Sequence, residues 1–324
     1  MTDQRMRITG SFLVLGRAGM DLYATPAGER IEDARGYVAH LGGSAANIAA
    51  TLSRLGAQTA LLSRVSDDAV GRFVLAELDR YGIDRRRVGQ SAGGVRTSLA
   101  VVETRLEDCQ SVIYRNQAAD FCLSEGDVAG VDFSTFGTLV VTGTAFADPV
   151  SRKASFLALQ RAREANLTTV MDVDYRPYSW GSNQEAQSVC LEAAGACDIV
   201  VGNDVEFGLL AGASEMGLGL ARNLASDGRR VAVYKMGEKG AVTVGLGTEF
   251  STGIYRTNAL KPTGAGDAFL GGFLFGLSKD TSLRDAVLRG SAAAAIVVSR
   301  VGCAPASPSL AELEAFLAQQ NAPN

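Results

Sequence analysis

The chain has 324 residues, 47% of them hydrophobic, and a formal net charge of −4. This length and composition suffice for one large α/β domain with a small excursion of strands. No block of Lys and Arg residues occurs, which argues against general nucleic-acid binding because that needs a concentrated cationic face. The only histidine is His40, so histidine-rich metal sites are excluded and carboxylates are the candidate catalytic bases.

The N-terminal part predicts neither a signal peptide nor a membrane span. Residues 1–7 are polar, and the apolar run that follows, residues 12–15, is too short for either. We therefore expect a cytoplasmic protein with no membrane partner. The five cysteines are scattered and lack the close pairs of a metal site, so we expect buried, reduced thiols at Cys109, Cys122, Cys190, Cys197 and Cys303.

The first elements place polar residues beside a predicted strand. Residues 12–16 form a short apolar run that ends in glycine, which predicts a buried strand, and Asp21 follows a few residues later. A carboxylate there lies where open α/β sheets bind ligands, although an ordinary loop aspartate fits equally well. Gly42 and Gly43 precede a predicted helix with Ser44 as N-cap and Asn47 in the first turn. Backbone near such glycines can approach a hydroxylated ligand.

Two β-prone regions interrupt the α/β pattern. Residues 24–40 mix turn formers with short β-prone pieces, and residues 95–121 contain two β-prone runs joined by a charged turn. We expect these regions to form a small sheet, a lid over the site. The predicted organisation is a single domain, residues 1–324, with lid insertions at about residues 22–41 and 95–121.

Strands and helices alternate through most of the chain. Further strands are predicted at residues 59–65, 139–142, 168–173, 199–201 and 231–234, with 241–244 as a hairpin partner of the last. Helices are predicted at residues 71–81, 151–165, 282–300 and 309–319. This alternation predicts a mostly parallel sheet covered by helices on both faces, with ligand groups at the carboxyl ends of the strands.

A glycine-rich stretch near the C-terminus is the strongest candidate for chemistry. Thr263, Gly264 and Gly266 precede an apolar run, so a helix N-terminus can converge on an anion with Asp267 in the first turn. Phe269 stands at the third glycine position of a dinucleotide fingerprint, and no Gly-Lys-Ser/Thr occurs, so neither a Rossmann site nor a P-loop is supported. Taken alone, the same stretch also fits a tight turn.

Four motifs in this order resemble the ribokinase-like, or PfkB, family of sugar kinases over about residues 14–302. They are residues 42–47, Asn203-x-x-Glu206, residues 235–240 and residues 263–267. The resemblance implies a three-layer α/β core with a β lid and ATP-dependent phosphorylation of a sugar hydroxyl. It also implies that Asp267 is the general base and that the amides of Ala265 and Gly266, after Gly264, form an anion hole.

The resemblance also implies which residues bind the nucleotide and its Mg²⁺. Asn203 and Glu206 match the element that helps to place Mg²⁺ through water, and Asn203 can serve as an N-cap at the same time. Lys235, Gly237, Gly240 and Thr263 match positions near the nucleotide. Two departures from the common pattern are Lys235 in place of a threonine, and Lys261-Pro262 in place of Asp-Thr. These departures leave a bound monovalent cation an open question.

The choice of sugar depends on two arginines. Within the family, the chain is most similar to kinases of a sugar acid in inositol breakdown, then to kinases of 2-keto-3-deoxygluconate, and then to fructokinases and ribokinases. Asp21, Gly42, Gly43 and Asn47 are candidate sugar contacts, and Arg115 and Arg176 could bind a carboxylate through guanidinium forks. Either arginine could instead form a structural ion pair.

An open lid sheet with exposed edges favours a homodimer. A non-catalytic nucleotide or sugar sensor with the same fold is the alternative of another class, and the intact Asp267 with Gly264 and Gly266 argues against it.

Overall fold

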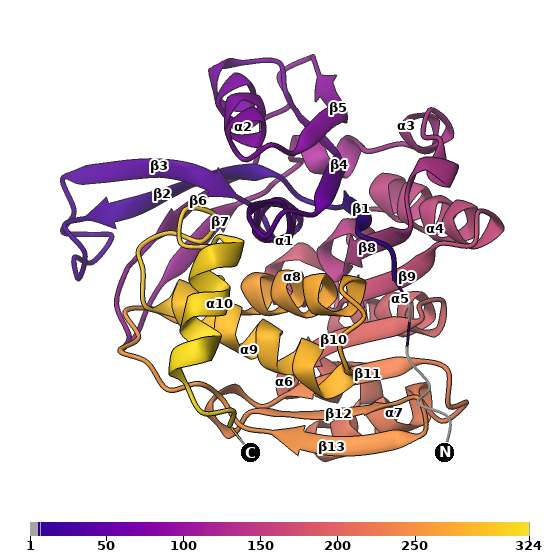
Figure 1. Ribbon diagram of the computed structural model, residues 1–324. Helices are drawn as coiled ribbons and strands as arrows, with labels where there is room; N and C mark the ends of the chain where they lie inside the picture. The colour runs from indigo at the N-terminus through magenta and orange to yellow at the C-terminus, as the bar shows by residue number, and fades with distance from the viewer. Residues whose placement is uncertain (1–5, 7, 324) are drawn as a thin grey trace.

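The computed structural model describes residue 6 and residues 8–323, so the rest of the polar segment 1–7 lies outside the described residues. The chain forms two β-sheets of unequal size, and helices pack on both faces of the larger one (Figure 1). Within residues 8–323, no helix combines the length and the apolar character that a membrane crossing requires.

The larger sheet has nine strands, and all neighbours from β11 to β5 are parallel. Its spatial order is β13 (Thr248–Thr252), β12 (Ala241–Gly245), β11 (Val231–Lys235), β10 (Ile199–Asn203), β9 (Thr168–Asp172), β8 (Thr138–Thr142), β1 (Ser11–Leu15), β4 (Gln58–Ser66) and β5 (Asp84–Ser91). β12 and β13 are antiparallel additions. The predicted parallel sheet and the predicted hairpin are both confirmed.

Side chains of β1 alternate between two hydrophobic clusters, one on each face of the sheet. Phe12 and Val14 belong to the first cluster, Leu13 and Leu15 to the second, and all four are fully buried. Burying each such side chain stabilises the fold by about 2 kcal/mol. A strand buried on both faces reads as an apolar run, which is why the sequence predicted it.

Helices cover the two clusters separately, which makes three layers. The first cluster includes side chains of α1 (Ser44–Arg54), α2 (Ala69–Arg80), α8 (Ala265–Ser278), α9 (Leu283–Val298) and α10 (Leu310–Gln319). The second includes side chains of α3 (Glu125–Ala129), α4 (Pro149–Glu164), α5 (Asn183–Gly195), α6 (Asp204–Ala211) and α7 (Gly217–Leu224). Short 3-10 helices are η1 (Ala119–Cys122), η2 (Phe133–Thr135), η3 (Gly143–Phe146), η4 (Pro177–Ser179), η5 (Ser214–Met216) and η6 (Gly237–Lys239). The predicted α/β class is confirmed.

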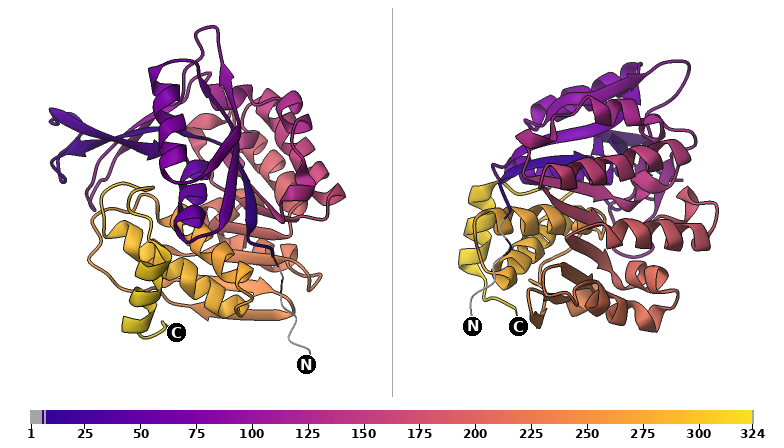
Figure 2. Two further views of the ribbon diagram at one scale, coloured as in Figure 1. Left: turned by 45° about the horizontal axis from the view of Figure 1, so that its top comes forward. Right: turned by 90° about the vertical axis from the view of Figure 1, so that its right-hand side faces the viewer.

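The smaller sheet, which we call the lid, projects from the side of the core (Figure 2). Its order is β3 (Gly36–Gly42), β2 (Gly19–Thr25), β6 (Leu99–Val102) and β7 (Ser111–Tyr114). β2 and β6 pair in parallel, so the two β-prone regions of the sequence meet in one sheet as predicted. The lid begins earlier than expected, and Asp21 therefore lies within β2 and not in a loop after β1.

Two local expectations differ from the structure. The edge strands β5 and β13 were not predicted, because β5 has the sequence Asp-Arg-Arg-Arg-Val-Gly-Gln-Ser and shows no apolar run. Ser44 was predicted as the N-cap of α1, and this was wrong. Gly43 is the N-cap, with φ of 96°, and the Ser44 hydroxyl donates instead to Asp174 Oδ2 at 2.6 Å.

The structure contains no disulfide among the described cysteines, and their burial differs. All five are free thiols, and Cys190, Cys197 and Cys303 are buried, whereas Cys109 and Cys122 are partly exposed. Burial raises the pKa of the Cys303 thiol to about 11, which keeps it protonated at neutral pH.

Candidate active site

A cavity of about 370 Å³ lies between the lid, the start of α1 and the start of α8. Its volume is within the range of about 300–1,000 Å³ that is typical of small-molecule sites. The polar and charged lining residues are Arg17, Asp21, Tyr23, Ser44, Asn47, Cys109, Ser111, Arg115, Thr144, Asp174, Arg176, Tyr178, Thr263, Asp267 and Cys303. The predicted residues Asp21, Asn47, Arg115, Arg176, Thr263, Gly264 and Asp267 thus share one cavity.

Asp267 lies in the first turn of α8 and faces this cavity. Asn47 Nδ2 donates to Asp267 Oδ2 at 2.9 Å, which connects the first turns of α1 and α8. Burial raises the pKa of Asp267 to about 7, and the nearby charge of Asp174 adds to this, while Asn47, Arg176 and Lys235 oppose it. A carboxyl group with a pKa near neutrality can take up a proton efficiently at physiological pH.

The backbone before Asp267 has a geometry suited to an anion. Gly264 is the N-cap of α8 with φ of 83°, and a Cβ there would lie 2.6 Å from Cys303 Sγ, so only glycine fits. The first amides of a helix have no intrahelical acceptor, and those of Ala265 and Gly266 are in this position. A Cβ on Gly266 would lie 3.4 Å from Lys235 Nζ, so a cation adjoins these amides. Together they favour a bound phosphate.

Buried polar atoms of the cavity lack partners among the described residues. They include Asp21 Oδ1, Asn47 Oδ1 and Thr263 Oγ1. Each unsatisfied buried group costs about 1–3 kcal/mol, so a ligand rich in hydroxyl groups would recover this cost. Burial raises the pKa of Asp21, while Arg17 and Lys261 oppose the shift.

Gly42 and Gly43 pack against Asp21 and Arg17, two residues that line the cavity. A Cβ on Gly42 would lie 1.9 Å from Asp21 Oδ1, and a Cβ on Gly43 would lie 2.3 Å from the carbonyl oxygen of Arg17. Neither glycine is among the described residues that line the cavity. The two glycines leave room for the Asp21 carboxylate and for the close approach of the chain at Arg17.

The arginines line the cavity and form ion pairs at the same time. Arg115 Nε donates to Asp120 Oδ2 at 3.0 Å, and its guanidinium lies 4.2 Å from the centre of the Phe121 ring. Arg176 Nη2 lies 2.9 Å from Asp174 Oδ1, and its side chain is 45% exposed. Arg115 is thus held rigidly, whereas Arg176 retains the freedom to meet a ligand.

Asp174 connects three parts of the site, and sequence reasoning did not predict its role. Its Oδ2 accepts hydrogen bonds from Ser44 Oγ at 2.6 Å and from Thr144 Oγ1 at 2.9 Å, while Oδ1 pairs with Arg176. Thr144 and Asp174 each stand two residues beyond a strand of the parallel sheet, β8 and β9. That position is the signal that could have identified both.

The Asn203-x-x-Glu206 motif caps α6 at the end of β10. Asn203 Oδ1 accepts from the Glu206 amide at 2.9 Å, and Glu206 Oε2 accepts from the Asn203 amide at 2.7 Å. Glu206 Oε1 also accepts from the Tyr175 amide at 3.2 Å. Asn203 and Lys235 are direct neighbours in the register of β10 and β11. The expected N-cap is confirmed, and both oxygens of the Glu206 carboxylate already accept backbone hydrogen bonds.

Gly237 and Gly240 bound the turn after β11. Both have positive φ, 58° and 84°. A Cβ on Gly240 would lie 1.9 Å from the carbonyl oxygen of Thr252, whereas a Cβ on Gly237 would meet nothing within 4 Å. Gly240 is therefore required for packing against β13, and Gly237 leaves open space beside the strand end.

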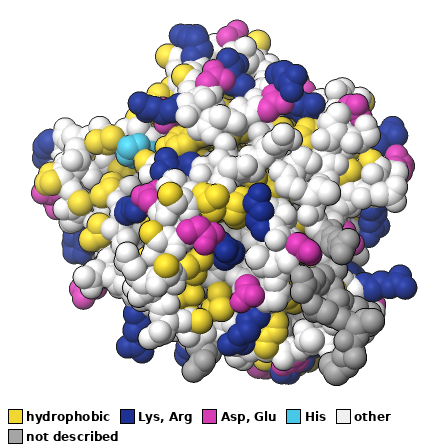
Figure 3. Space-filling model, viewed as in Figure 1, with side chains coloured by type: hydrophobic (Ala, Val, Ile, Leu, Met, Phe, Trp, Pro, Cys, Tyr) yellow, Lys and Arg dark blue, Asp and Glu magenta, His cyan; other side chains and the backbone are white. Residues whose placement is uncertain are grey.

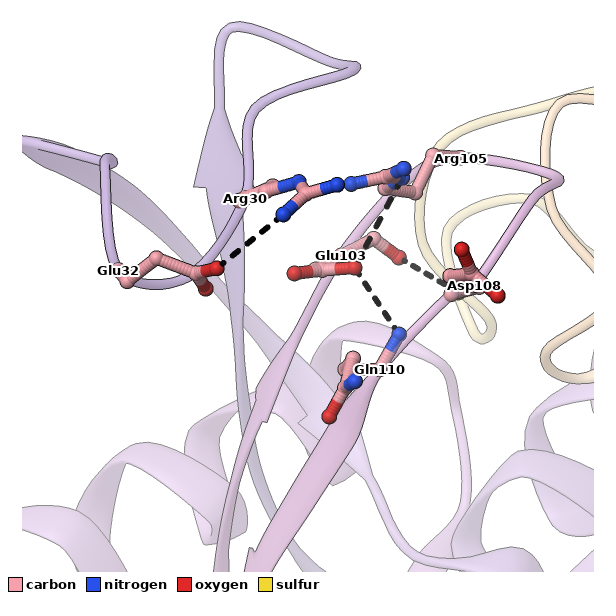
Figure 4. A pocket seen from close by; sticks show the side chains of 7 residues that line it. Arg30, Glu32, Glu103, Arg105, Asp108 and Gln110 are labelled. Carbon is pink, nitrogen blue, oxygen red and sulfur yellow. Dashed lines mark hydrogen bonds and ion pairs between the residues drawn. The ribbon is translucent and has the colours of Figure 1, made fainter.

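A second cavity, of about 320 Å³, lies at the outer end of the lid (Figure 4). Glu103 is buried there and accepts hydrogen bonds from the amides of Ile31 and Gln110, both at 3.0 Å. Arg30 pairs with Glu32, and Arg105 lies 4.0 Å from Glu103. None of the predicted site residues lines this cavity, and its charges hold the ends of the lid strands together.

Comparisons with known proteins agree with this geometry. The sequence pattern of the pfkB family of carbohydrate kinases matches residues 10–310. The chain belongs to this family. The expected ribokinase-like kinase fold and the enzyme class are thereby confirmed.

Curated relatives of this pfkB carbohydrate kinase cover nearly its whole length. A 5-dehydro-2-deoxygluconokinase from Photobacterium profundum is 40% identical over 310 residues, which are 94% of each chain. One from Geobacillus kaustophilus is 36% identical over 313 residues, 95% of this chain and 93% of the relative. Among solved structures, a double mutant of fructokinase from Vibrio cholerae with fructose, ADP and potassium ion bound has a TM-score of 0.84 at 27% identity, covering 96% of this chain and 100% of that one.

Proposed function

We propose that this pfkB kinase transfers the γ-phosphoryl group of ATP to a primary hydroxyl of a sugar acid, 5-dehydro-2-deoxy-D-gluconate. The observation that carries the proposal is that the Asp267 carboxylate and the guanidinium groups of Arg17, Arg115 and Arg176 line one cavity. A base beside an anion site serves phosphoryl transfer, and guanidinium groups favour a substrate with a carboxylate. The names of the relatives support the same substrate.

Asp267 accepts the proton in the proposed step. The sugar hydroxyl oxygen forms a bond to the γ-phosphorus while the bond from that phosphorus to the β–γ bridging oxygen breaks, and ADP leaves with the electron pair. The hydroxyl proton passes to Asp267. The amides of Gly264, Ala265 and Gly266 and the ammonium of Lys235 stabilise the negative charge of the transferring group.

Mg²⁺ would accompany ATP and neutralise its phosphates. Mg²⁺ usually keeps several waters and takes only one or two carboxylates besides the substrate phosphates. The chemistry of Asn203 and Glu206 fits this pattern, because both carry side-chain oxygens and they lie together at the start of α6. Asn203 and Glu206 would hold the hydration water of the ion, and the unpartnered Thr263 hydroxyl is available to the nucleotide phosphates.

A substrate screen tests the proposal. ATP and Mg²⁺ are combined with 5-dehydro-2-deoxygluconate, 2-keto-3-deoxygluconate, fructose or ribose, and ADP release is measured. We expect kcat/KM for 5-dehydro-2-deoxygluconate to exceed that for the neutral sugars by about 100-fold or more, because the guanidinium groups that line the cavity gain charge-assisted hydrogen bonds only from a carboxylate. Preference for 2-keto-3-deoxygluconate or for a neutral sugar would reassign the substrate, and nucleotide binding without turnover of any sugar would indicate a sensor.

We propose that residues 1–324 act as one kinase domain in the cytoplasm, as a homodimer that joins through the lid. The lid strands expose apolar side chains, namely Tyr37, Val38, Val112 and Tyr114. Hydrophobic side chains reach the surface at several places on the face shown in Figure 3. Exposed apolar side chains on an open sheet favour a partner surface of the same kind. Light scattering during gel filtration would show twice the monomer mass, and a monomer at micromolar concentration would contradict the proposal.

A further inference from the structure

Lys261 is fully buried, with 0% of its surface exposed. Lysine is almost never fully buried unless its charge is compensated. The Nζ of Lys261 donates to the backbone carbonyl oxygen of Thr263, which is a neutral acceptor. Burial lowers the pKa of Lys261, and the negative groups around it, including Asp267 and Asp21, oppose this shift. The buried amino group of Lys261 therefore has a neutral carbonyl oxygen as its hydrogen-bond acceptor, and it lies beside the loop of residues 263–267.

The carbonyl that Lys261 holds belongs to the first peptide unit of the anion site. In a trans peptide, the carbonyl and the N–H point in opposite directions. Holding the Thr263 oxygen therefore fixes the direction of the Gly264 N–H, which precedes the free amides of α8. A positive charge on the carbonyl also polarises this peptide and strengthens its N–H as a donor.

The other side of the loop is closed by packing. A Cβ on Gly264 would lie 2.6 Å from Cys303 Sγ, and Cys303 Sγ in turn lies 3.0 Å from Tyr23 Oη. The loop is thus enclosed between the Lys261 ammonium and Cys303. Lys261 is the charged member of this enclosure, and the phosphoryl-transfer step proposed above does not use it.

We propose that the Lys261 ammonium is a built-in monovalent cation, which orients the Gly264 amide for the transferring phosphoryl group and makes added potassium unnecessary. This inference rests on the proposed function. A potassium ion accompanies ADP and fructose in the structure of a Vibrio cholerae fructokinase double mutant, and a calcium ion does so in another structure of that fructokinase. In this chain, the Thr263 carbonyl already holds a cation that is covalently part of the protein. Lys261 is accordingly a positioning residue.

The first test uses the unmodified protein. Turnover of 5-dehydro-2-deoxygluconate and the melting temperature are measured in potassium, sodium and tetramethylammonium chloride at equal ionic strength. We expect kcat to differ by less than about twofold and the melting temperature to be the same, because the carbonyl is already occupied. Activation by potassium of more than about fivefold would overturn the proposal.

The second test removes the ammonium. Lys261→Ala should lower kcat by about 100-fold with little change in KM, since misdirecting one donor of an oxyanion site has this effect. Potassium or propylammonium should then restore kcat by about tenfold and raise the melting temperature of this variant. Lys261→Met fills the same space without charge and should not respond to either cation. Lys153→Met, at an exposed lysine of α4, is the control for loss of a lysine charge.

The outcomes separate this inference from the proposed function. An unchanged kcat in Lys261→Ala, or equal responses of the Ala and Met variants to cations, would reduce Lys261 to a packing role. If neither variant folds, the effect of potassium on the kcat of the unmodified protein still tests the proposal. If the unmodified protein phosphorylates no sugar, the proposed function fails, while the effect of potassium on the melting of Lys261→Ala still reports on the role of Lys261.

Discussion

The phosphate end and the sugar end of the cavity are built in different ways. At the proposed phosphate end, the groups offered to a ligand are backbone amides at the start of α8, and the helix behind them is buried from Ala268 to Leu277. At the proposed sugar end, side chains from the lid and from strand ends line the cavity, and several lid side chains are exposed. Backbone groups on a core helix are fixed by the fold, whereas side chains on a lid can change without disturbing it. We therefore expect the phosphate end to set the chemistry and the sugar end to set the choice of substrate.

Loss of the Asp267 carboxylate tests the phosphate end and should have the largest effect. Asp267→Asn should lower kcat by about 10³-fold or more and leave ATP binding within about twofold, because the base acts only in the transition state. A coupled assay of ADP release and calorimetric titration of ATP measure the two effects. Asp285→Asn removes a first-turn carboxylate from α9, outside the cavity, and is the matched control.

A variant Asp267→Asn that keeps more than about a tenth of the original kcat would contradict the assignment of the base. A loss shared equally by the Asp285→Asn control would point to a general effect of charge at helix starts. Either result would remove the distinction between a catalytic phosphate end and a selective sugar end.

Arg176 tests the sugar end. Arg176→Ala should raise KM for the sugar acid by about tenfold or more and change kcat little, because its half-exposed guanidinium meets the carboxylate in both ground and transition states. Arg176→Lys keeps the charge without the planar fork and should recover only part of the loss. Equal changes in KM for the acid and for a neutral analogue would make Arg176 a partner of Asp174 only.

The same contrast explains what the sequence could predict. The Gly264-to-Asp267 loop, the Asn203 cap and the strand alternation depend on neighbours a few residues away, and local patterns predict them. Asp174 gathers hydrogen bonds from Ser44, 130 residues away, and from Thr144, 30 residues away. No local pattern carries contacts across such distances, and Ser44 was therefore mistaken for an N-cap. Strand β5 was missed because an edge position tolerates its charges.

The pH dependence of turnover links the two ends. Because the pKa of Asp267 is about 7, kcat/KM should rise as the pH increases through 7 and then level off. The hydrogen bond from Asn47 lowers this pKa, so Asn47→Ala should move the rise to higher pH, by about one unit. Profiles of kcat/KM from pH 5 to 9 measure the shift. Asn223→Ala, at an exposed position of α7, should leave the profile unchanged.

The smallest expected effect is on stability, and its size depends on pH. The pKa of Asp267 is raised from 3.8 to about 7 in the folded state, so the folded protein holds this proton more tightly than the unfolded chain does. Stability is therefore lost as the pH rises from about 4 through 7, and the loss is complete above 7. Asp267→Asn cannot ionise and should escape this loss.

At pH 8 we expect Asp267→Asn to be more stable than the unmodified protein by about 2 kcal/mol, which is about half the full value of the shift because the carboxylate faces a solvated cavity. For a chain of this length the melting temperature should rise by about 3 °C. At about pH 4, before most of this loss has occurred, the two proteins should melt together. An equal difference at both pH values would show that the gain comes from packing and would remove the evidence for an ionised base at the phosphate end.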